Sequence, residues 1–541
     1  LLITGIGGFF RFYNLNWDQG HLFHPDERNL ASAVTKISFF NQLNPEFFAY
    51  GSLPIYLYRL IGELLVLITH NHSWISDWGQ INLIGRGVSA TVSTASIGLV
   101  YYLSRKLFNK KIALFSALLM ATFPSLIQVA HFGVTESLIT FWTILLAILS
   151  LKLFEKPSFF RYTLTGIFLG LSVATKISTL SLLSFLGLAH FLNYPQLKKP
   201  SVNFLKQIVK HSIKFLLLTF SAFTTFLALS PFVFLSWPKF TESINYEGGV
   251  VSGRLKVVYV FQFEKTLPYL FQLKNLFWQI GPVALVAVLG FLWLCWLTLK
   301  NRNKKQLIFL IFPLCYFAYV GSWYTKFIRY MIPLLPFLAI SASWLIYNFE
   351  RRWKKVAQTL IVLTLVSSMF WALAFFSIYT RKSTRITASQ WIYQNIPKQA
   401  KILTEHWDDG LPVSIPPHRA SQFQTESLTI YDPDNPKKAL YYSEKLAESD
   451  YLIFNSRRLY GTLMNWPERY PITSRYYHLL FQEKLGYRKV AQFTSYPSFL
   501  GLKIIDDRSE ETFQVYDHPK VIIFKNIERL NQAEILNKIN L

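Results

Sequence analysis

Two adjacent carboxylates at the start of a helix are the residues best suited to chemistry in this sequence. Asp26 and Glu27 stand in the run His24-Pro25-Asp26-Glu27-Arg28-Asn29, after the apolar segment 1–12 and before the amphipathic segment 30–37. Proline fits the first turn of a helix because its missing N–H would have no partner there. The acids would then lie at the positive end of the helix dipole and could simply complement it. They could also do acid–base chemistry, so the surroundings of this run decide its role.

The composition indicates a membrane protein with many spans. Of the 541 residues, 52% are hydrophobic, 17% are aromatic and only 16% are charged. Apolar stretches long enough to cross a bilayer, which takes ~20 residues, recur as far as residue 379. We therefore expect a transmembrane module over 1–379 and a soluble domain over 380–541.

The net charge of +25 does not indicate a nucleic-acid partner, because of where the charges lie. Residues 1–379 hold 33 Lys and Arg against 12 Asp and Glu, whereas 380–541 hold 22 against 18. Twenty of those 33 fall between apolar segments, in the clusters 105–111, 152–161, 198–214, 300–305 and 351–355. This is the positive-inside pattern, so each cluster should be cytoplasmic.

An even number of spans must separate neighbouring cytoplasmic clusters, and this condition predicts eleven spans. The predicted spans are 1–12, 81–103, 112–130, 138–153, 162–174, 179–192, 213–235, 276–299, 307–319, 331–347 and 356–378. Segment 53–69 is also apolar but carries Arg59 and Glu63, and a charge at mid-membrane costs ~2.5–3.5 kcal/mol. We interpret it as an interfacial helix. Residues 14–80 then form one large outer loop, and the domain at 380–541 also lies outside.

Two other regions are distinctive. The outer loop 236–275, with Glu247 near its middle, is too long for a plain connector and suggests a lid or substrate loop. From residue 380 onward, short β-type runs alternate with helical ones, which predicts a small extracytoplasmic α/β domain with a hairpin over 513–525. The two cysteines, Cys295 and Cys315, both stand in apolar segments and suggest neither a disulfide framework nor a metal knuckle.

Ionisable residues at membrane depth outside the basic clusters are candidates for a site. Glu136 and His131 stand where a span begins, although a capped helix start with a hydrogen-bonded histidine would explain them equally well. Arg86 could extend to the outer interface, and Arg329 could anchor a helix end there. Lys176 falls where one apolar run breaks into the next and is hard to explain by packing.

By this topology all of these residues face outward and form an acidic and basic cavity at the outer surface of the bilayer. A sugar linked to a lipid phosphate presents its leaving group at that level. Cations there can stabilise the departing phosphate without a nucleotide. A carboxylate on the opposite side can accept the proton of an incoming hydroxyl.

Short segments in this order resemble the GT-C superfamily of glycosyltransferases, and most closely the protein O-mannosyltransferase and lipid A aminoarabinose transferase group. The segments are 24–29, Tyr50-Gly51-Ser52-Leu53-Pro54-Ile55-Tyr56, Thr135-Glu136, Ala174-Thr175-Lys176 and Arg329-Tyr330-Met331-Ile332-Pro333-Leu334-Leu335-Pro336. The resemblance implies a GT-C type, α-helical polytopic membrane protein of about 11 transmembrane helices with a C-terminal extracytoplasmic α/β domain. It also implies inverting, nucleotide-independent transfer from a polyprenyl-phosphate-linked sugar.

In that family the acidic pair after the first span carries the catalytic base, which implies Asp26 and Glu27 here, and a second outer acid corresponds to Glu136. The sequence departs from the pattern at Ser52-Leu53-Pro54, where relatives often have His-Pro-Pro or Lys-Pro. Which cation holds the donor phosphate therefore stays open. The candidate residues are Asp26, Glu27 and Glu136 for catalysis, Lys176, Arg329 and Arg86 for the donor phosphate, and His24, Glu247 and His131 around the substrate.

We therefore expect a glycosyltransferase of the cell membrane, with Asp26 as the general base and a lipid, glycan or protein as acceptor. No cofactor is required, although His24, Asp26 and Glu136 could together hold a divalent metal ion. A transporter or flippase for lipid-linked glycans is the main alternative, because broken spans with charges at mid-depth also suit transporters. An inverted internal repeat would favour that alternative, and the sequence shows none. A catalytically inactive scaffold would be expected to have lost the acidic pair, which is present.

Overall fold

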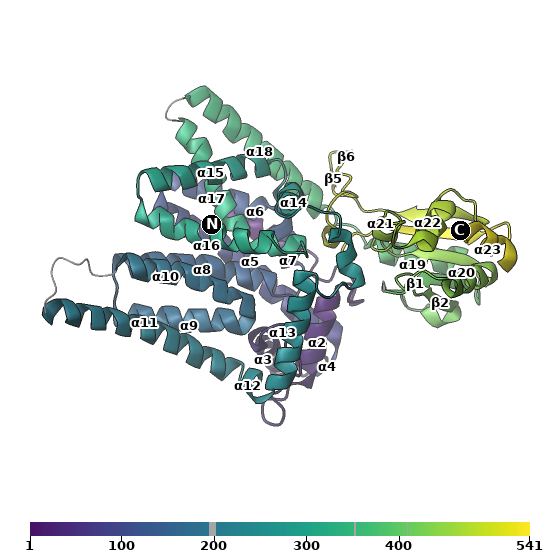
Figure 1. Ribbon diagram of the computed structural model, residues 1–541, viewed down its shortest axis with the longest axis horizontal. Helices are drawn as coiled ribbons and strands as arrows, with labels where there is room; N and C mark the ends of the chain where they lie inside the picture. Colours follow the sequence, from purple (N-terminus) through teal and green to yellow (C-terminus); the bar gives the residue numbers. More distant parts are fainter. Residues whose placement is uncertain (194–201, 351–352, 408, 541) are drawn as a thin grey trace. The chain divides into compact units, whose positions relative to one another are not determined.

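The computed structural model describes residues 1–193, 202–350, 353–407 and 409–540. Parts of two predicted basic clusters, 198–201 and 351–352, lie outside these ranges. The chain forms two compact units (Figure 1). The first unit comprises Leu1–Asn16, His24–Leu255 and Leu267–Phe376, and the second comprises Trp17–Phe23, Lys256–Thr266 and Ser377–Leu541. Two short segments from the predicted outer loops therefore belong to the second unit.

The first unit is built from helices. They are α1 (Leu2–Phe12), α2 (Pro25–Lys36), α3 (Ser52–Thr69), α4 (Ser73–Ser76), α5 (Trp78–Leu107), α6 (Lys110–Thr122), α7 (Pro124–Ala130), α8 (Glu136–Glu155), α9 (Phe159–Thr175), η1 (Ile177–Leu182), α10 (Leu183–Leu192), α11 (Val202–Leu229), α12 (Phe232–Leu235), α13 (Trp237–Ser252), α14 (Leu270–Ile280), α15 (Val283–Lys300), α16 (Lys304–Gly321), η3 (Ile328–Leu334), α17 (Leu335–Glu350) and α18 (Lys354–Phe376).

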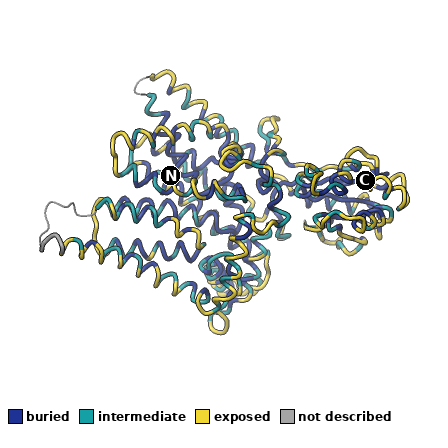
Figure 2. Tube along the Cα trace, in the orientation of Figure 1, coloured by how far each residue is buried: buried dark blue, intermediate teal, exposed yellow. Residues whose placement is uncertain are grey.

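The apolar helices make the chain a multi-pass membrane protein. Seven helices in the described ranges are long and apolar enough to cross a membrane, and an eighth span results if the bent pair α6 and α7 is one span. Three further apolar helices are shorter, Leu2–Phe12, Phe159–Thr175 and Ile177–Leu192. Each of the eleven segments predicted as a span is formed by helices, with short breaks at 123 in segment 112–130, at 230–231 in segment 213–235 and at 281–282 in segment 276–299. Figure 2 shows buried positions where these helices face one another and exposed positions along the outer sides of α11, α15 and α18.

Several spans are broken where the sequence places proline. α6 and α7 meet at an angle of 57°, because Pro124 cannot donate the backbone hydrogen bond that would continue α6. The break frees backbone carbonyls, and the buried Arg11 of α1 donates to those of Met120 at 2.8 Å and Ala121 at 3.0 Å. Pro282 separates α14 from α15 in the same way.

α3 corresponds to segment 53–69, which we predict to lie at the interface. By length and composition alone it would also qualify as a span. Arg59 and Glu63 pair along the helix, with Nη2 and Oε1 2.7 Å apart. The chain then doubles back, and a Cβ at Gly62, in the middle of α3, would lie 2.8 Å from the carbonyl oxygen of Trp74. α5 therefore begins beside the middle of α3, and the interfacial position of α3 stays a prediction.

The second unit is an α/β domain, which confirms the predicted fold class. Its strands are β1 (Lys401–Glu405), β2 (Gln424–Leu428), β3 (Tyr451–Phe454), β4 (Tyr487–Phe493), β5 (Ser498–Phe499), β6 (Leu502–Lys503) and β7 (Val521–Asn526). Five strands form a sheet in the order β2-β1-β3-β7-β4, and β5 and β6 form a separate pair. β1 runs parallel to β2 and β3, whereas β7 runs antiparallel to β3 and β4.

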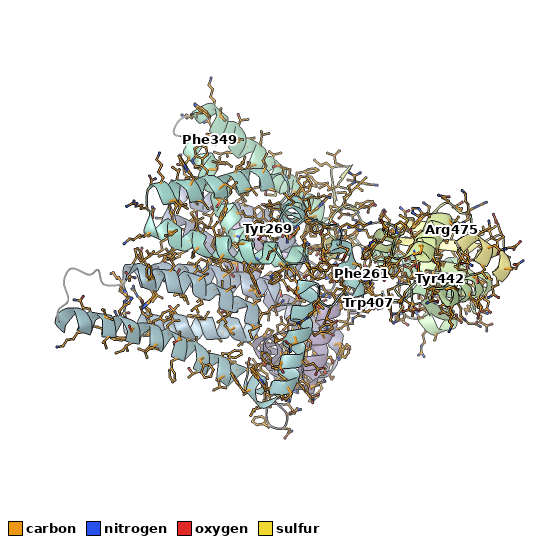
Figure 3. All side chains as sticks on the ribbon, in the orientation of Figure 1. Phe261, Tyr269, Phe349, Trp407, Tyr442 and Arg475 are labelled. Carbon is orange, nitrogen blue, oxygen red and sulfur yellow. The ribbon has the colours of Figure 1, made fainter. Side chains whose placement is uncertain are left out.

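Helices cover both faces of this sheet. They are η2 (Val258–Phe263), α19 (Thr384–Asn395), η4 (Ala420–Gln422), α20 (Pro436–Glu448), α21 (Tyr460–Leu463), α22 (Pro471–Phe481), η5 (Glu511–Phe513) and α23 (Gln532–Ile539). On one face, α20 and α22 bring Tyr442 and Tyr476 into one core with Phe524 of β7, and α23 adds Ile535. Phe261 of η2, which Figure 3 labels together with Tyr442, belongs to the same core. On the other face, α19 packs Ile392 against Ile523 of the same strand.

The predicted hairpin over 513–525 is wrong. Residues 511–513 form the short helix η5, and β7 pairs with β3 and β4 instead. The expected turn contains the fully buried His518, whose Nε2 lies 2.7 Å from Asp506 Oδ2 and whose Nδ1 lies 2.5 Å from Asp517 Oδ1. Burial alone would lower the pKa of His518, but the two carboxylates raise it to about 10. A buried cluster of charges therefore takes the place of a surface turn.

Candidate active site

The run 24–29 forms the N-terminus of α2, as predicted. His24 is the residue before the helix, and its Nδ1 accepts a hydrogen bond from the backbone N–H of Asp26 at 3.2 Å. Leu30 and Val34 on the apolar side of α2 pack against α3 and α5. Because neighbouring side chains on a helix point about 100° apart, Asp26 and Glu27 enter different environments.

Glu27 points into the protein and forms a closed ion pair with Arg86 of α5. Arg86 Nε lies 2.8 Å from Oε1, and Nη2 lies 2.7 Å from Oε2. The backbone N–H of Gly133 also donates to Oε1 at 2.6 Å. The two side chains are 0% and 1% exposed, so neither reaches a ligand without rearrangement. This ion pair therefore joins α2 to α5 in the interior.

The loop before α8 is fixed by backbone contacts at close range. A Cβ on Gly133 would lie 3.2 Å from the backbone nitrogen of Arg86, tighter than most real contacts, so the loop and α5 approach closely here. His131 is fully buried, with Nδ1 2.8 Å from the carbonyl of Ile127 and Nε2 2.9 Å from that of Tyr13. The histidine therefore holds the loop in place, and Glu136 follows as the first residue of α8.

Asp26 lies on the open side of α2 and meets a cation from a distant part of the chain. Its carboxylate accepts a hydrogen bond from Nη1 of Arg329, which lies in η3, and another from the hydroxyl of Tyr50. Burial alone would raise the pKa of Asp26, but Arg329, His24 and Tyr50 hold it well below its usual value. Asp26 keeps 19% of its side-chain exposure and Arg329 27%, so this pair, unlike Glu27 and Arg86, remains accessible.

Lys176 lies at a break between helices, as the sequence predicts. It ends α9 in an extended conformation before η1 begins. Its Nζ lies 3.9 Å from Oε1 of Glu136 and 4.8 Å from the ring centre of Tyr50. The end of α9 is held to α8, because Trp142 Nε1 donates to the hydroxyl of Thr175 at 2.9 Å. Glu136 is nearly buried, and its Oε2 has no hydrogen-bond partner in the described part of the chain.

Tyr50 joins the two halves of the cluster, and the residue after it explains how. Gly51 donates to the carbonyl of Thr175 at 3.0 Å, and a Cβ at this glycine would lie 1.9 Å from the carbonyl oxygen of Ala174. Only glycine permits this approach. Burial and the nearby Asp26 raise the pKa of Tyr50 well above its usual value, so its hydroxyl stays protonated and donates to the carboxylate.

Glu247 of α13 extends the cluster on its exposed side. Desolvation by the surrounding protein raises its pKa, whereas the charges of Arg329 and Lys176 act in the opposite direction. The loop 236–275 therefore brings one acid near both cations. The structure thus gathers Asp26, Glu136, Lys176, Arg329 and Glu247 around Tyr50.

The other sequence candidates have supporting positions. His24 caps the N-terminus of α2, His131 holds the loop before α8, and Glu27 and Arg86 pair in the interior. Sequence reasoning did not assign Tyr50 or Gly51 to the site, although both stand in the segment 50–56 that carries the resemblance. The close approach of Gly51 to the end of α9 is a contact between residues far apart in the sequence, so no local sequence pattern could predict it.

The cluster can hold an anion beside a carboxylate. Its charged groups alternate in sign from one contact to the next. The cation Arg329 contacts the anion Asp26, and the cation Lys176 faces the anion Glu136. The neutral Tyr50 lies between the two pairs. Two cations from separate elements could share one phosphate through charge-assisted hydrogen bonds. Within the described ranges, no group of three or more His, Cys, Asp or Glu side chains is placed to hold a metal ion.

Residues 79–231, which include Glu136 and Lys176, match the family model described as dolichyl-phosphate-mannose-protein mannosyltransferase. The sequence gives no significant match to a curated protein.

Among solved structures, the chain is similar to the oligosaccharyltransferase AglB of Archaeoglobus fulgidus, with 13% identity and a TM-score of 0.49 over 88% of this chain and 71% of that one. It is also similar to ArnT of Cupriavidus metallidurans, with 12% identity and a TM-score of 0.47 over 97% of both chains. A protein O-mannosyltransferase complex of S. cerevisiae shares 19% identity at a TM-score of 0.34, over 44% of this chain and 33% of that one. The chain is thus similar, over residues 79–231, to the family described as dolichyl-phosphate-mannose-protein mannosyltransferase.

Proposed function

We propose that this glycosyltransferase moves a sugar from a polyprenyl-phosphate carrier to an acceptor hydroxyl on the extracytoplasmic side of the cell membrane. The observation that carries the proposal is the convergence of Asp26, Lys176 and Arg329, from three distant parts of the chain, on one accessible cluster. The family model supports a lipid-phosphate donor, because its description names a dolichyl-phosphate sugar. The acceptor is a lipid, a glycan or a protein.

Lys176 and Arg329 are the cations proposed to hold the donor phosphate. Both keep part of their side-chain surface exposed, at 20% and 27%. The leaving group is the polyprenyl phosphate, whose negative charge grows as the bond to the sugar breaks. Fixed cations stabilise that developing charge more than they stabilise the bound donor, which is the condition for accelerating transfer.

Asp26 is proposed as the general base. The acceptor oxygen forms a bond to the anomeric carbon while the bond from that carbon to the phosphate oxygen breaks. The proton of the acceptor hydroxyl passes to the Asp26 carboxylate, and the electron pair of the broken bond leaves on the phosphate. A single displacement of this kind inverts the anomeric configuration.

The pairing of Asp26 with Arg329 has a consequence for this step. A carboxylate whose pKa is held low is always ionised but is a weak base. When a donor phosphate accepts hydrogen bonds from Arg329, it competes with Asp26 for the same N–H groups. Donor binding would thereby weaken the ion pair and make Asp26 more basic in the presence of the sugar.

The remaining acids have positioning roles. Glu136 faces Lys176 and fixes its ammonium group next to Tyr50. Glu247, on the exposed side, is suited to contact the acceptor or the sugar. The step proposed here requires no metal ion, so transfer should persist in the presence of a chelator; loss of transfer there would instead favour a divalent ion at His24, Asp26 and Glu136.

The proposal is tested by binding of polyprenyl phosphate to the purified protein, measured by native mass spectrometry. Lys176→Gln and Arg329→Gln should each weaken binding about tenfold or more, since a charge-assisted hydrogen bond contributes ~1.5–3 kcal/mol. Lys274→Gln, which removes an exposed charge of α14, is the matched control and should bind like the parent. Parental binding by both site variants would refute the assignment of the phosphate site.

A further inference from the structure

A basic cavity lies at the ends of α8 and α9 that are remote from the candidate active site. It has a volume of about 420 Å³ and lies where α5 and α8 end and α9 begins. α8 and α9 run side by side to this point (Figure 1). The active-site residues Glu136 and Lys176 stand at the other ends of these two helices, so the cavity is a separate feature.

Cations dominate the lining of this cavity. Lys106, Lys152, Lys156 and Arg161 line it, with Glu155 as the one acid among the lining residues. Lys106 and Lys305 already share the carboxylate of Glu155, at 2.5 and 2.7 Å. The cavity therefore carries a surplus of positive charge, and bringing like charges together costs free energy unless an anion joins them.

Arg161 is held in an orientation that leaves donors available. Its Nη1 donates to the carbonyls of Lys152 at 3.1 Å and Lys156 at 3.0 Å, which caps the C-terminal end of α8. Among the described residues, no acceptor is seen for its other two nitrogens. Lys156 is exposed and likewise has no acceptor for its ammonium group in that part of the chain.

The cavity also has an apolar side. Leu149, Leu164 and Phe160 line this side, and Phe160 is 74% exposed. Basic and aromatic side chains together at the end of a span are typical of the boundary between the headgroups and the hydrocarbon of a bilayer. A ligand that fits both parts has a negatively charged head and an apolar tail.

We propose that this cavity binds the headgroup of an anionic phospholipid from the leaflet on the side of the basic clusters. Basic pockets between spans on that side are suited to such headgroups, and each Lys or Arg near the surface contributes ~1 kcal/mol to the attraction. The lipid would neutralise the surplus charge where α5, α8 and α9 meet. The site is independent of the proposed transfer reaction.

The test uses the full-length protein in an uncharged detergent, titrated with phosphatidylglycerol, phosphatidylcholine or inorganic phosphate. Bound lipid is measured by native mass spectrometry and stability by the thermal unfolding temperature. Phosphatidylglycerol should bind and stabilise the parent protein, whereas phosphatidylcholine and inorganic phosphate should have little effect. The double variant Lys152→Gln/Lys156→Gln should bind phosphatidylglycerol roughly 30-fold more weakly, at ~1 kcal/mol for each lysine.

The control variant Lys354→Gln/Lys355→Gln loses the same charge from exposed positions at the start of α18, and it should bind like the parent. An equal loss in the control would show general attraction to a basic surface and would overturn the site. Equal binding by the pocket variant and the parent would also overturn it. A response to inorganic phosphate as strong as that to the lipid would contradict a lipid ligand. If the double variant is not monodisperse, the single variant Lys156→Gln, at an exposed position, replaces it in the comparison. Its binding of phosphatidylglycerol should be about fivefold weaker, on the order of 1 kcal/mol.

Discussion

Arg329 and Asp26 stand 303 positions apart in the sequence, yet the guanidinium of one donates a hydrogen bond to the carboxylate of the other. The pair is partly exposed, in contrast to the closed pair of Glu27 and Arg86 one residue further along α2. Two adjacent acids thus have different surroundings. Asp26 is partly exposed, and Glu27 is buried between α2 and α5.

The first prediction concerns the pH dependence of transfer. Asp26 must be ionised to act as a base, so activity should fall as the pH drops through its pKa. Because Arg329 holds that pKa below its usual value, Arg329→Gln should raise it and move the acidic limb of the kcat/KM profile to higher pH. Arg329→Lys keeps the charge and should move the limb less. Identical acidic limbs in the parent and in Arg329→Gln would contradict the electrostatic role of this pair.

Gly51→Ala tests how the site is assembled. The added Cβ would meet the carbonyl oxygen of Ala174 at 1.9 Å, a backbone atom that cannot turn aside. Overpacking of this kind typically costs ~1–3 kcal/mol. We expect a lower unfolding temperature and weaker donor binding, because Tyr50 and Lys176 would move apart. Gly98→Ala, where a Cβ meets nothing within 4 Å, is the control and should leave both measurements unchanged.

Glu27→Gln should act on stability. Removing one partner of a buried ion pair typically costs ~3–5 kcal/mol, because the remaining charge is left without compensation. Less folded protein should be recovered, and the folded fraction should keep a kcat near that of the parent. The double variant Glu27→Leu/Arg86→Leu should recover part of the lost stability in thermal unfolding. A normal yield of Glu27→Gln with transfer abolished would instead place Glu27 in the chemistry.

The orientation of the outer loops is tested by cysteine labelling on intact cells. In a background with Cys295 and Cys315 replaced by serine, Asn41→Cys and Lys503→Cys should both react with a membrane-impermeant thiol reagent. Lys110→Cys, in a basic cluster, should react only after the cells are opened. Labelling at 503 without labelling at 41 would show that α3 spans the membrane and that Asp26 faces the cytoplasm.

The sequence predicts the helices well because hydrophobicity and charge pattern are local properties. All eleven predicted spans are helical, and the break at Lys176 lies where the apolar run is interrupted. The sharp bend at Pro124 was not predicted, because the apolar run continues through it. Arg11, more than a hundred positions away, donates hydrogen bonds to the carbonyls that this bend frees.

The candidate site, like the fold, could be predicted only where local sequence determines it, and not where contacts between distant residues do. Residue type and position brought Asp26, Glu136, Lys176 and Arg329 into consideration. Residue type could not separate Asp26 from Glu27, since their difference arises from what faces each side of α2. In the second unit, the run 513–525 resembles a hairpin locally, but the carboxylates around His518 and the pairing of β7 with β3 decide otherwise.

The central claim is that Asp26 removes the proton of the acceptor hydroxyl, and one comparison tests it most directly. Asp26→Asn keeps the shape of the side chain and removes its basicity. The control is Asp77→Asn, the same substitution in the same predicted outer loop. Asp77 caps the N-terminus of α5, a position where asparagine serves equally well. Donor binding and sugar transfer are measured on both variants. Asp26→Asn should bind the donor and transfer sugar ~10²–10⁴-fold more slowly, while Asp77→Asn should match the parent in both. Transfer by Asp26→Asn at a rate close to that of the parent would contradict the account.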